Sequence, residues 1–224
     1  MLSPPESQTT ASKSLVKDEN EINYELEIEV LKRIYLAKMA TKKNPELIVD
    51  SGNQQIICQL VRHFRSDEET GVMLVGFKGT GKTMLMRLFS FYCKFYDYKA
   101  GYPTHNVDYL TYLYRTKGEI GLNEFTYNVR ETNGENISMK PIDVCIDDMG
   151  LEKTSASSYG DKENVISLIL NTRYSLNEYR IKTHATTNLD AKQLTDHYKE
   201  RLASRFNEMF TIYDMPATAK DRRL

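Results

Sequence analysis

A glycine-rich segment that follows an apolar run constrains the fold of this 224-residue chain more than any other feature. The segment runs from Gly76 to Thr83, reads GFKGTGKT and fits the pattern G-x-x-x-x-G-K-[ST]. Its glycines allow the backbone to turn so that successive N–H groups point inward at phosphate oxygens. The apolar run over residues 71–75 predicts a strand, and residues 82–98 predict a helix whose positive end faces the same phosphates. The sequence therefore predicts a phosphate-binding loop between a strand and a helix.

This loop predicts which residues contact a bound nucleotide. Nine consecutive residues would line the phosphates: Gly76, Phe77, Lys78, Gly79, Thr80, Gly81, Lys82, Thr83 and Met84. Lys82 would reach the β- and γ-phosphates, and the hydroxyl of Thr83 would be a ligand of Mg²⁺. We therefore expect the chain to bind a nucleotide together with Mg²⁺.

A second apolar run, Ile142 to Ile146, ends in a pair of aspartates. Asp147, at the tip of this predicted strand, would hold Mg²⁺ directly or through water. Asp148 would polarise an attacking water as a general base. Taken alone, the segment is equally well explained by a strand that runs into an acidic turn. Its place downstream of the phosphate-binding loop favours the catalytic interpretation.

Two further segments would complete such a site. The strand predicted over residues 181–187 ends in the polar tract Thr-Thr-Asn, and Asn188 could hold an attacking water by hydrogen bonds without ionising. The helix predicted over residues 199–209 places Arg201 and Arg205 on one face, from which one of them could reach the γ-phosphate of a neighbouring subunit. Two such arginines are more often exposed salt-bridge partners, so the helix alone does not establish this role.

In this order the four segments resemble the motifs of the AAA+ ATPases, and specifically of the DnaC/IstB-like group of helicase loaders and transposition helper ATPases. The resemblance rests on GFKGTGKT, VCIDDMGLE, THATTNLD and RLASRF, and it spans about residues 45–224. It implies that Asn188 is the sensor residue, that Arg205 is an arginine finger acting in trans, and that Arg201 assists it. It also implies a homo-oligomer with ATP and Mg²⁺ at its subunit interfaces, in which four residues are catalytic: Lys82, Asp148, Asn188 and Arg205.

The resemblance further implies the fold. Alternating strands and helices already predict an α/β chain with a parallel sheet covered on both faces. The group has a five-stranded parallel sheet with an extra strand between the Walker A and Walker B strands, which residues 106–109 would provide. Few residues follow Tyr213, so we expect no C-terminal lid domain over the nucleotide.

One residue departs from the pattern of most AAA+ enzymes. They carry Glu after the Walker B aspartate, whereas this chain has Asp148, which is one methylene shorter. An attacking water would lie less favourably against the shorter side chain. We therefore predict slow ATP hydrolysis until a partner or DNA tightens the site.

The segment before this domain is less regular. Residues 1–21 are mostly small, polar or charged and predict a disordered tail. Residues 22–44 alternate in hydrophobicity as a strand does, but their composition and charge order favour a helix, which we predict. The helix could lie on the body of the domain or act as an arm that docks on a partner, and the sequence leaves both open. Residues 45–224 would form the AAA+ ATPase domain.

Composition excludes several classes of protein. The 30 Lys and Arg residues nearly balance the 31 Asp and Glu residues, so the chain cannot coat nucleic acid by bulk charge. No apolar run approaches the roughly 20 residues of a membrane helix, and the N-terminus lacks a secretory signal. The three cysteines are widely spaced and suit a reducing compartment. We predict a cytoplasmic protein that does not associate with membranes.

The function predicted from these features is that of a replicative helicase loader which binds single-stranded DNA and a replicative DNA helicase. The alternative is an ATP-dependent transposition helper that assembles on double-stranded DNA. A nucleotide kinase is disfavoured because no second substrate pocket is found, and a non-hydrolysing adaptor is disfavoured by the intact catalytic residues. Exposed aromatic and basic residues would contact DNA; the candidates are Tyr109, Tyr112 and Tyr114, whereas Phe89, Tyr92 and Tyr96 are predicted to pack in the core.

Overall fold

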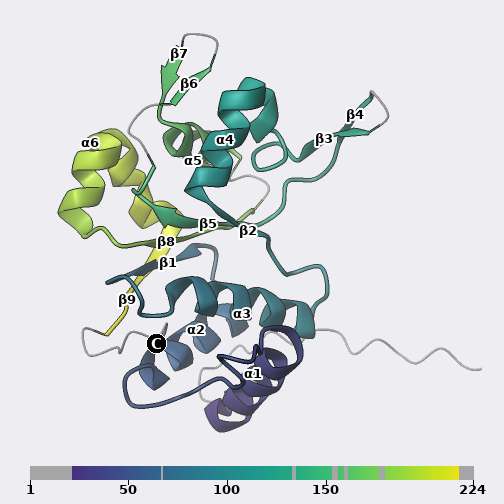
Figure 1. The fold of residues 1–224 in the computed structure, drawn as a ribbon, viewed down its shortest axis with the longest axis vertical. Helices are drawn as coiled ribbons and strands as arrows, with labels where there is room; N and C mark the ends of the chain where they lie inside the picture. Colours follow the sequence, from purple (N-terminus) through teal and green to yellow (C-terminus); the bar gives the residue numbers. More distant parts are fainter. Residues whose placement is uncertain are drawn as a thin grey trace, which may run out of the picture.

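A parallel sheet of five strands forms the centre of the molecule and confirms the predicted fold class (Figure 1). In sheet order β2-β5-β8-β1-β9, the strands are β2 Thr104–Asn106, β5 Val144–Met149, β8 Thr183–Thr187, β1 Gly71–Val75 and β9 Phe210–Asp214. This computed structural model describes residues 22–66, 68–132, 135–152, 156–158, 161–176 and 180–216. The predicted tail, residues 1–21, lies outside them.

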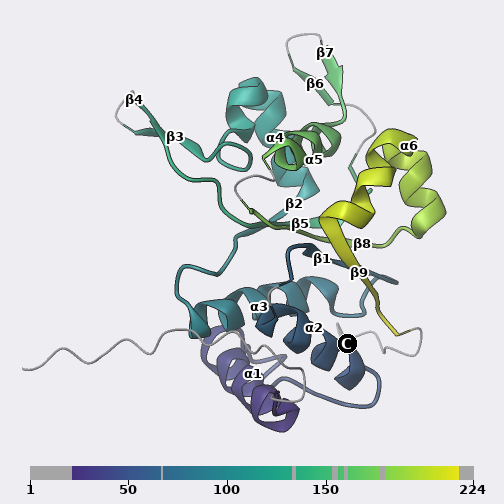
Figure 2. The same cartoon turned by 180° about the vertical axis from the view of Figure 1, so that it is seen from behind.

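Helices cover both faces of the sheet. One face carries α2 Gln54–Arg65 and α3 Lys82–Tyr96, and α1 Tyr24–Lys38 packs against these two helices on the side away from the sheet (Figures 1 and 2). The other face carries α4 Val107–Lys117, the short 3₁₀ helix η2 Gly118–Leu122, α5 Val165–Ser175 and α6 Ala191–Met209. Two antiparallel hairpins project beyond α4 and α5 (Figure 1): β3 Val129–Thr132 with β4 Glu135–Ser138, and β6 Ala156–Ser158 with β7 Asp161–Glu163.

Two apolar cores lie on the two faces, because successive residues of each buried strand point to opposite sides. In β1, Val72 and Leu74 pack with α1, α2 and α3, whereas Met73 packs with α4, α5 and α6. All three side chains are fully buried. An apolar strand between two helical layers therefore fixes the position from which the glycine-rich loop leaves the sheet.

The N-terminal helix α1 begins where the side chain of Asn23 accepts a hydrogen bond from the backbone N–H of Leu26. Its apolar face, with Leu31, Ile34 and Tyr35, is buried against the body of the chain. The helix lies within the predicted range 22–44 but is shorter than that range. Of the two roles left open, the packing fits a helix that lies on the body. A docking role would have to use the outward face of α1.

The strand predicted over residues 106–109 lies earlier in the chain, so its predicted position was wrong. The strand is β2, and it ends at Asn106 because the side chain of Asn106 accepts a hydrogen bond from the N–H of Tyr109 and starts α4. In the sheet, β2 lies at the edge beyond β5, and the strand between β1 and β5 is β8.

Two helix boundaries also differ from the prediction. The helical spacing of apolar residues predicts a helix over residues 162–179, but residues 161–163 form β7, and the side chain of Asn164 caps α5 by accepting from the N–H of Ser167. Helix α6 contains the helix predicted over residues 199–209 and also an earlier part that was not predicted, which begins at Ala191 with a capping box formed by Asp190 and Gln193. It is interrupted at Lys199, whose φ of 63° is not helical.

A buried arginine ties the amino ends of β5 and β8 to helix α5. The guanidinium of Arg173 donates hydrogen bonds to Thr183 Oγ1 (2.8 Å) and to three carbonyl oxygens, those of Phe125, Ile142 and Lys182, at 2.8 to 3.0 Å. Burial lowers the pKa of Arg173 to about 10, although nearby Asp143 opposes the shift. The sequence gives no sign of this role.

We expect Arg173→Met to lower the free energy of unfolding by about 3 to 5 kcal/mol, because it leaves buried acceptors without a donor. Urea denaturation of the full chain would measure the loss. Arg33→Met is the matched control, since the Arg33 side chain is 79% exposed on α1, and it should cost almost nothing. Equal stability of the two variants would contradict the stabilising role of the Arg173 hydrogen bonds.

Candidate functional site

The glycine-rich loop joins β1 to α3 and has a backbone that only glycine adopts readily. Gly76, Gly79 and Gly81 have φ values of 152°, 89° and 94°, in a region that L side chains rarely occupy. A Cβ on Gly76 would lie 2.7 Å from Cβ of Met215, which follows β9. The loop is therefore fixed both by its own conformation and by the end of β9.

Lys82 and Asn188 meet at this loop although they are 106 positions apart. The ammonium group of Lys82 donates hydrogen bonds to the carbonyls of Gly76 (2.7 Å) and Phe77 (3.0 Å) and to Oδ1 of Asn188 (2.7 Å). Lys82 is only 5% exposed. Since Asn188 follows β8 and Lys82 opens α3, the neighbouring positions of β1 and β8 in the sheet produce this contact.

Thr83 and Asp147 provide two adjacent oxygen groups of the kind Mg²⁺ prefers. Oδ1 of Asp147 accepts hydrogen bonds from the hydroxyl of Thr83 (2.8 Å) and from that of Thr186 (2.7 Å). This donor set fits the proposed ligation of Mg²⁺ together with nucleotide phosphates. Within the described ranges, no group of three or more His, Cys, Asp or Glu side chains is placed to hold a metal ion.

Asp148 lies in a bulge of β5. The pairing of β5 with β8 shifts register between Ile146 and Met149, and Asp148 has a φ of 62°. Asp148 is half-buried at the end of the sheet, whereas Asp147, one position earlier, is buried. The bulge thus separates the environments of the two aspartates.

Two threonines of the polar tract at the end of β8, Thr186 and Thr187, hold this bulge in place. The N–H of Asp148 donates to Oγ1 of Thr186 (2.9 Å), and Oγ1 of Thr187 donates to the carbonyl of Met149 (2.7 Å). Both threonines are fully buried. Their sequence signal was the polar tract at the end of the predicted strand, which indicated a site but not that these hydroxyls would fix the acidic turn.

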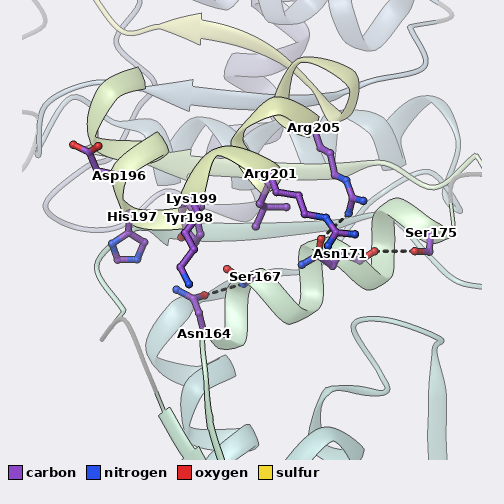
Figure 3. Close-up of a pocket in the computed structure, with 11 residues that line it drawn as sticks. Asn164, Ser167, Asn171, Ser175, Asp196, His197, Tyr198, Lys199, Arg201 and Arg205 are labelled. Carbon is purple, nitrogen blue, oxygen red and sulfur yellow. Dashed lines mark hydrogen bonds between the residues drawn. The ribbon is translucent and has the colours of Figure 1, made fainter.

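Arg201 and Arg205 line a cavity that includes no residue of the glycine-rich loop. Together with residues of α5 they line a cavity of about 750 Å³ between α5 and α6, and Figure 3 shows both arginines extending from α6 toward Asn171. The guanidinium of Arg205 donates to Oδ1 of Asn171 (2.6 Å) and lies 4.3 Å from the ring centre of Tyr174. The predicted action of Arg205 across a subunit interface stays a prediction.

The aromatic candidates for a DNA-facing surface divide into two groups. Tyr114 is 3% exposed and packs in the core beneath α4, so the prediction that it faces DNA was wrong. Tyr109 and Tyr112 are exposed on the outer face of α4, and Arg115, three residues after Tyr112, is exposed beside them. The tyrosines and Phe89 predicted for the core of α3 do pack there.

No helix in the described part of the chain has the length and apolar character needed to span a membrane. This finding agrees with the absence of a long apolar run in the sequence.

Comparisons with known proteins show the fold. No protein-family model matches the sequence, and no curated protein matches it significantly. Among solved structures, the chain is similar to the DnaC helicase loader, with 18% identity, a TM-score of 0.57 and coverage of 82% of this chain and 99% of that one. It is also similar to DnaI, with 21% identity, a TM-score of 0.54 and coverage of 84% and 93%. The chain thus has the fold of the DnaC-like AAA+ ATPases, as the sequence motifs indicated.

Proposed function

We propose that this chain binds ATP with Mg²⁺, hydrolyses it, and acts as a replicative helicase loader. One observation carries the first part of the proposal. Lys82, Thr83, Asp147 and Asn188, which come from three separate segments, meet beside the glycine-rich loop at the carboxyl ends of the strands. Ligands of open parallel sheets bind at this edge.

The roles of the residues follow from their chemistry. Loop N–H groups and Lys82 would hold the phosphates, and Thr83 and Asp147 would hold Mg²⁺, which neutralises phosphate charge when bound. Asp148 would accept a proton from the attacking water, and Asn188 would orient that water by hydrogen bonds. Since Lys82 already contacts Asn188, the group that binds phosphate and the group that orients water are held together before the reaction.

Likeness in fold to a helicase loader supports a loading role over other uses of an ATPase, and a replicative DNA helicase would be its protein partner. Subunits would assemble with nucleotide at their interfaces in the cytoplasm. Single-stranded DNA would lie along α4, where the exposed Tyr112 and Arg115 combine a stacking surface with a positive charge. The alternative remains a transposition helper that assembles on double-stranded DNA.

Binding to fluorescent oligonucleotides, measured by anisotropy with and without a slowly hydrolysed ATP analogue, tests this function. We expect preference for single strands that depends on the analogue. Cooperative coating of double strands would favour the transposition helper. No binding to either strand would contradict intrinsic DNA contact and leave the helicase as the only partner.

In the same assay, Tyr112→Ala should weaken single-strand binding by about tenfold, since stacking of one base is worth about 1 to 3 kcal/mol. Tyr98→Ala is the matched control, because Tyr98 is 77% exposed but lies beyond the end of α3. If both variants bind as the unmodified chain does, α4 is not the DNA surface.

A further inference from the structure

A buried glutamate connects the turn after the two aspartates to helix α6. Glu152 is 5% exposed, and one oxygen of its carboxylate accepts a hydrogen bond from the N–H of Gly150 (2.8 Å). The other oxygen accepts from the hydroxyl of Tyr198 and from Nε2 of His197, the latter at 3.1 Å. Burial and the neighbouring Glu152 raise the pKa of Tyr198, which keeps this hydroxyl protonated and able to donate.

These contacts join two segments that matter for the proposed reaction. On one side, Gly150 is two residues after Asp148 and has a φ of 89°, and a Cβ there would lie 2.2 Å from Cδ1 of Leu189. On the other side, Tyr198 is the last residue before the non-helical Lys199. The part of α6 that follows this break carries Arg201 and Arg205 (Figure 3).

A carboxylate suits this position better than any other side chain. It accepts hydrogen bonds at both oxygens and donates none, so it satisfies an N–H, a hydroxyl and an imidazole N–H at once. A glutamine offers one oxygen and an NH₂ group, which would face at least one of these donors. A buried network of this kind holds its members rigidly when every member is satisfied.

We propose that Glu152 is a positioning residue that holds two segments as one unit: the Asp148 turn, through Gly150, and the arginine-bearing half of α6, through Tyr198, whose ring centre lies 5.7 Å from that of Phe206 beyond the break. A change at the Asp148 turn would then move Arg205, the residue predicted to act on a neighbouring subunit, and the reverse would also hold. The hydrogen bonds of Glu152 go to Gly150, His197 and Tyr198, and none of these residues belongs to the glycine-rich loop. Glu152 therefore affects the reaction through the turn and through α6. The catalytic part of this inference rests on the proposed ATPase function.

Hydrogen exchange of the full chain, without nucleotide, tests the connection itself. We expect Glu152→Gln to speed backbone exchange both at residues 149–151 and at residues 199–206, and to leave α2 and α3 unchanged. The matched control is Glu27→Gln. Glu27 is likewise buried and accepts from two tyrosines, Tyr92 and Tyr96, on the opposite face of the sheet. Faster exchange that is confined to one of the two segments, or spread over the whole chain, would overturn the proposal.

Steady-state ATP hydrolysis tests the consequence for the reaction. Glu152→Gln should lower kcat by about tenfold or more, because small displacements of catalytic groups have large effects on rate, while KM for ATP changes less than twofold. Glu27→Gln should leave both constants unchanged. An unchanged kcat in folded Glu152→Gln protein would refute the positioning role. Absence of hydrolysis by the unmodified chain would instead count against the proposed function, and the exchange experiment would still decide the connection.

Discussion

Lys82→Ala is expected to weaken binding of an ATP analogue by about 100-fold. Hydrogen bonds to charged groups are worth up to about 3 kcal/mol, and a factor of ten in affinity corresponds to about 1.4 kcal/mol. The Lys82 ammonium lies between the loop carbonyls and Asn188, so a phosphate entering the loop would meet it directly. Fluorescence titration or calorimetry with the analogue and Mg²⁺ measures the loss.

Lys78→Ala controls for charge alone, because Lys78 would face the phosphates with its backbone N–H, which the variant keeps, while its side chain is exposed. It should retain affinity within about threefold, as expected for a screened surface charge. Asp148→Asn should also retain affinity, since Asp148 is assigned to the water and not to the phosphates. Equal losses in Lys82→Ala and Lys78→Ala would mean that the loop binds anions only by general charge.

Arg205→Ala is expected to lower kcat by about 10³-fold, the lower end of what an arginine finger contributes. Activity should return when the variant is mixed with Asp148→Asn protein, because each supplies what the other lacks. The Asp148→Asn subunit cannot turn over ATP but presents an intact Arg205 to its neighbour. A coupled phosphate-release assay across a series of mixing ratios gives the measurement.

No recovery of activity at any mixing ratio would contradict action of Arg205 across an interface.

Asn171 supplies a useful comparison, because it accepts a 2.6 Å hydrogen bond from Arg205. Asn171→Ala keeps the arginine and removes only this contact. It should therefore change kcat far less than Arg205→Ala, and it should need no mixing to remain active. An equally large loss would assign the role to the Arg205–Asn171 pair.

Much of the fold could be predicted because its signals are local. The buried strand β1 is a short apolar run, α3 has helical spacing, and the loop between them follows a known pattern. The order of the strands in the sheet depends on contacts between distant segments, and no local pattern reports those. Two errors in element bounds have local causes instead. The strand before α4 was expected too late because Asn106 ends it and caps the helix. The first part of α6, Ala191 to Tyr198, was missed because it has a polar outer face and few apolar residues.

The site divides in the same way. Lys82, Thr83 and Asp147 could be predicted because phosphate and Mg²⁺ chemistry restricts both residue type and spacing. The roles of Thr186, Arg173 and Glu152 could not be predicted. Thr186 contacts the backbone of a residue 38 positions away. Arg173 and Glu152 each contact groups from other segments of the chain. Tyr114 was misplaced because an aromatic residue on a helix has the same local sequence whether it faces solvent or the core.

The order of the strands also affects how the protein is made. Strand β1 lies between β8 and β9, the last two strands of the sheet along the chain, and Met215 packs against Gly76. While the chain is being synthesised, β1 and its loop leave the ribosome long before either neighbouring strand exists. The most apolar strand of the molecule must therefore wait, partly uncovered, until synthesis passes residue 214, and such an interval exposes a nascent chain to aggregation. A chain that ended before β9 would leave β1 as an unpaired edge of the sheet and would lack Met215 beside Gly76.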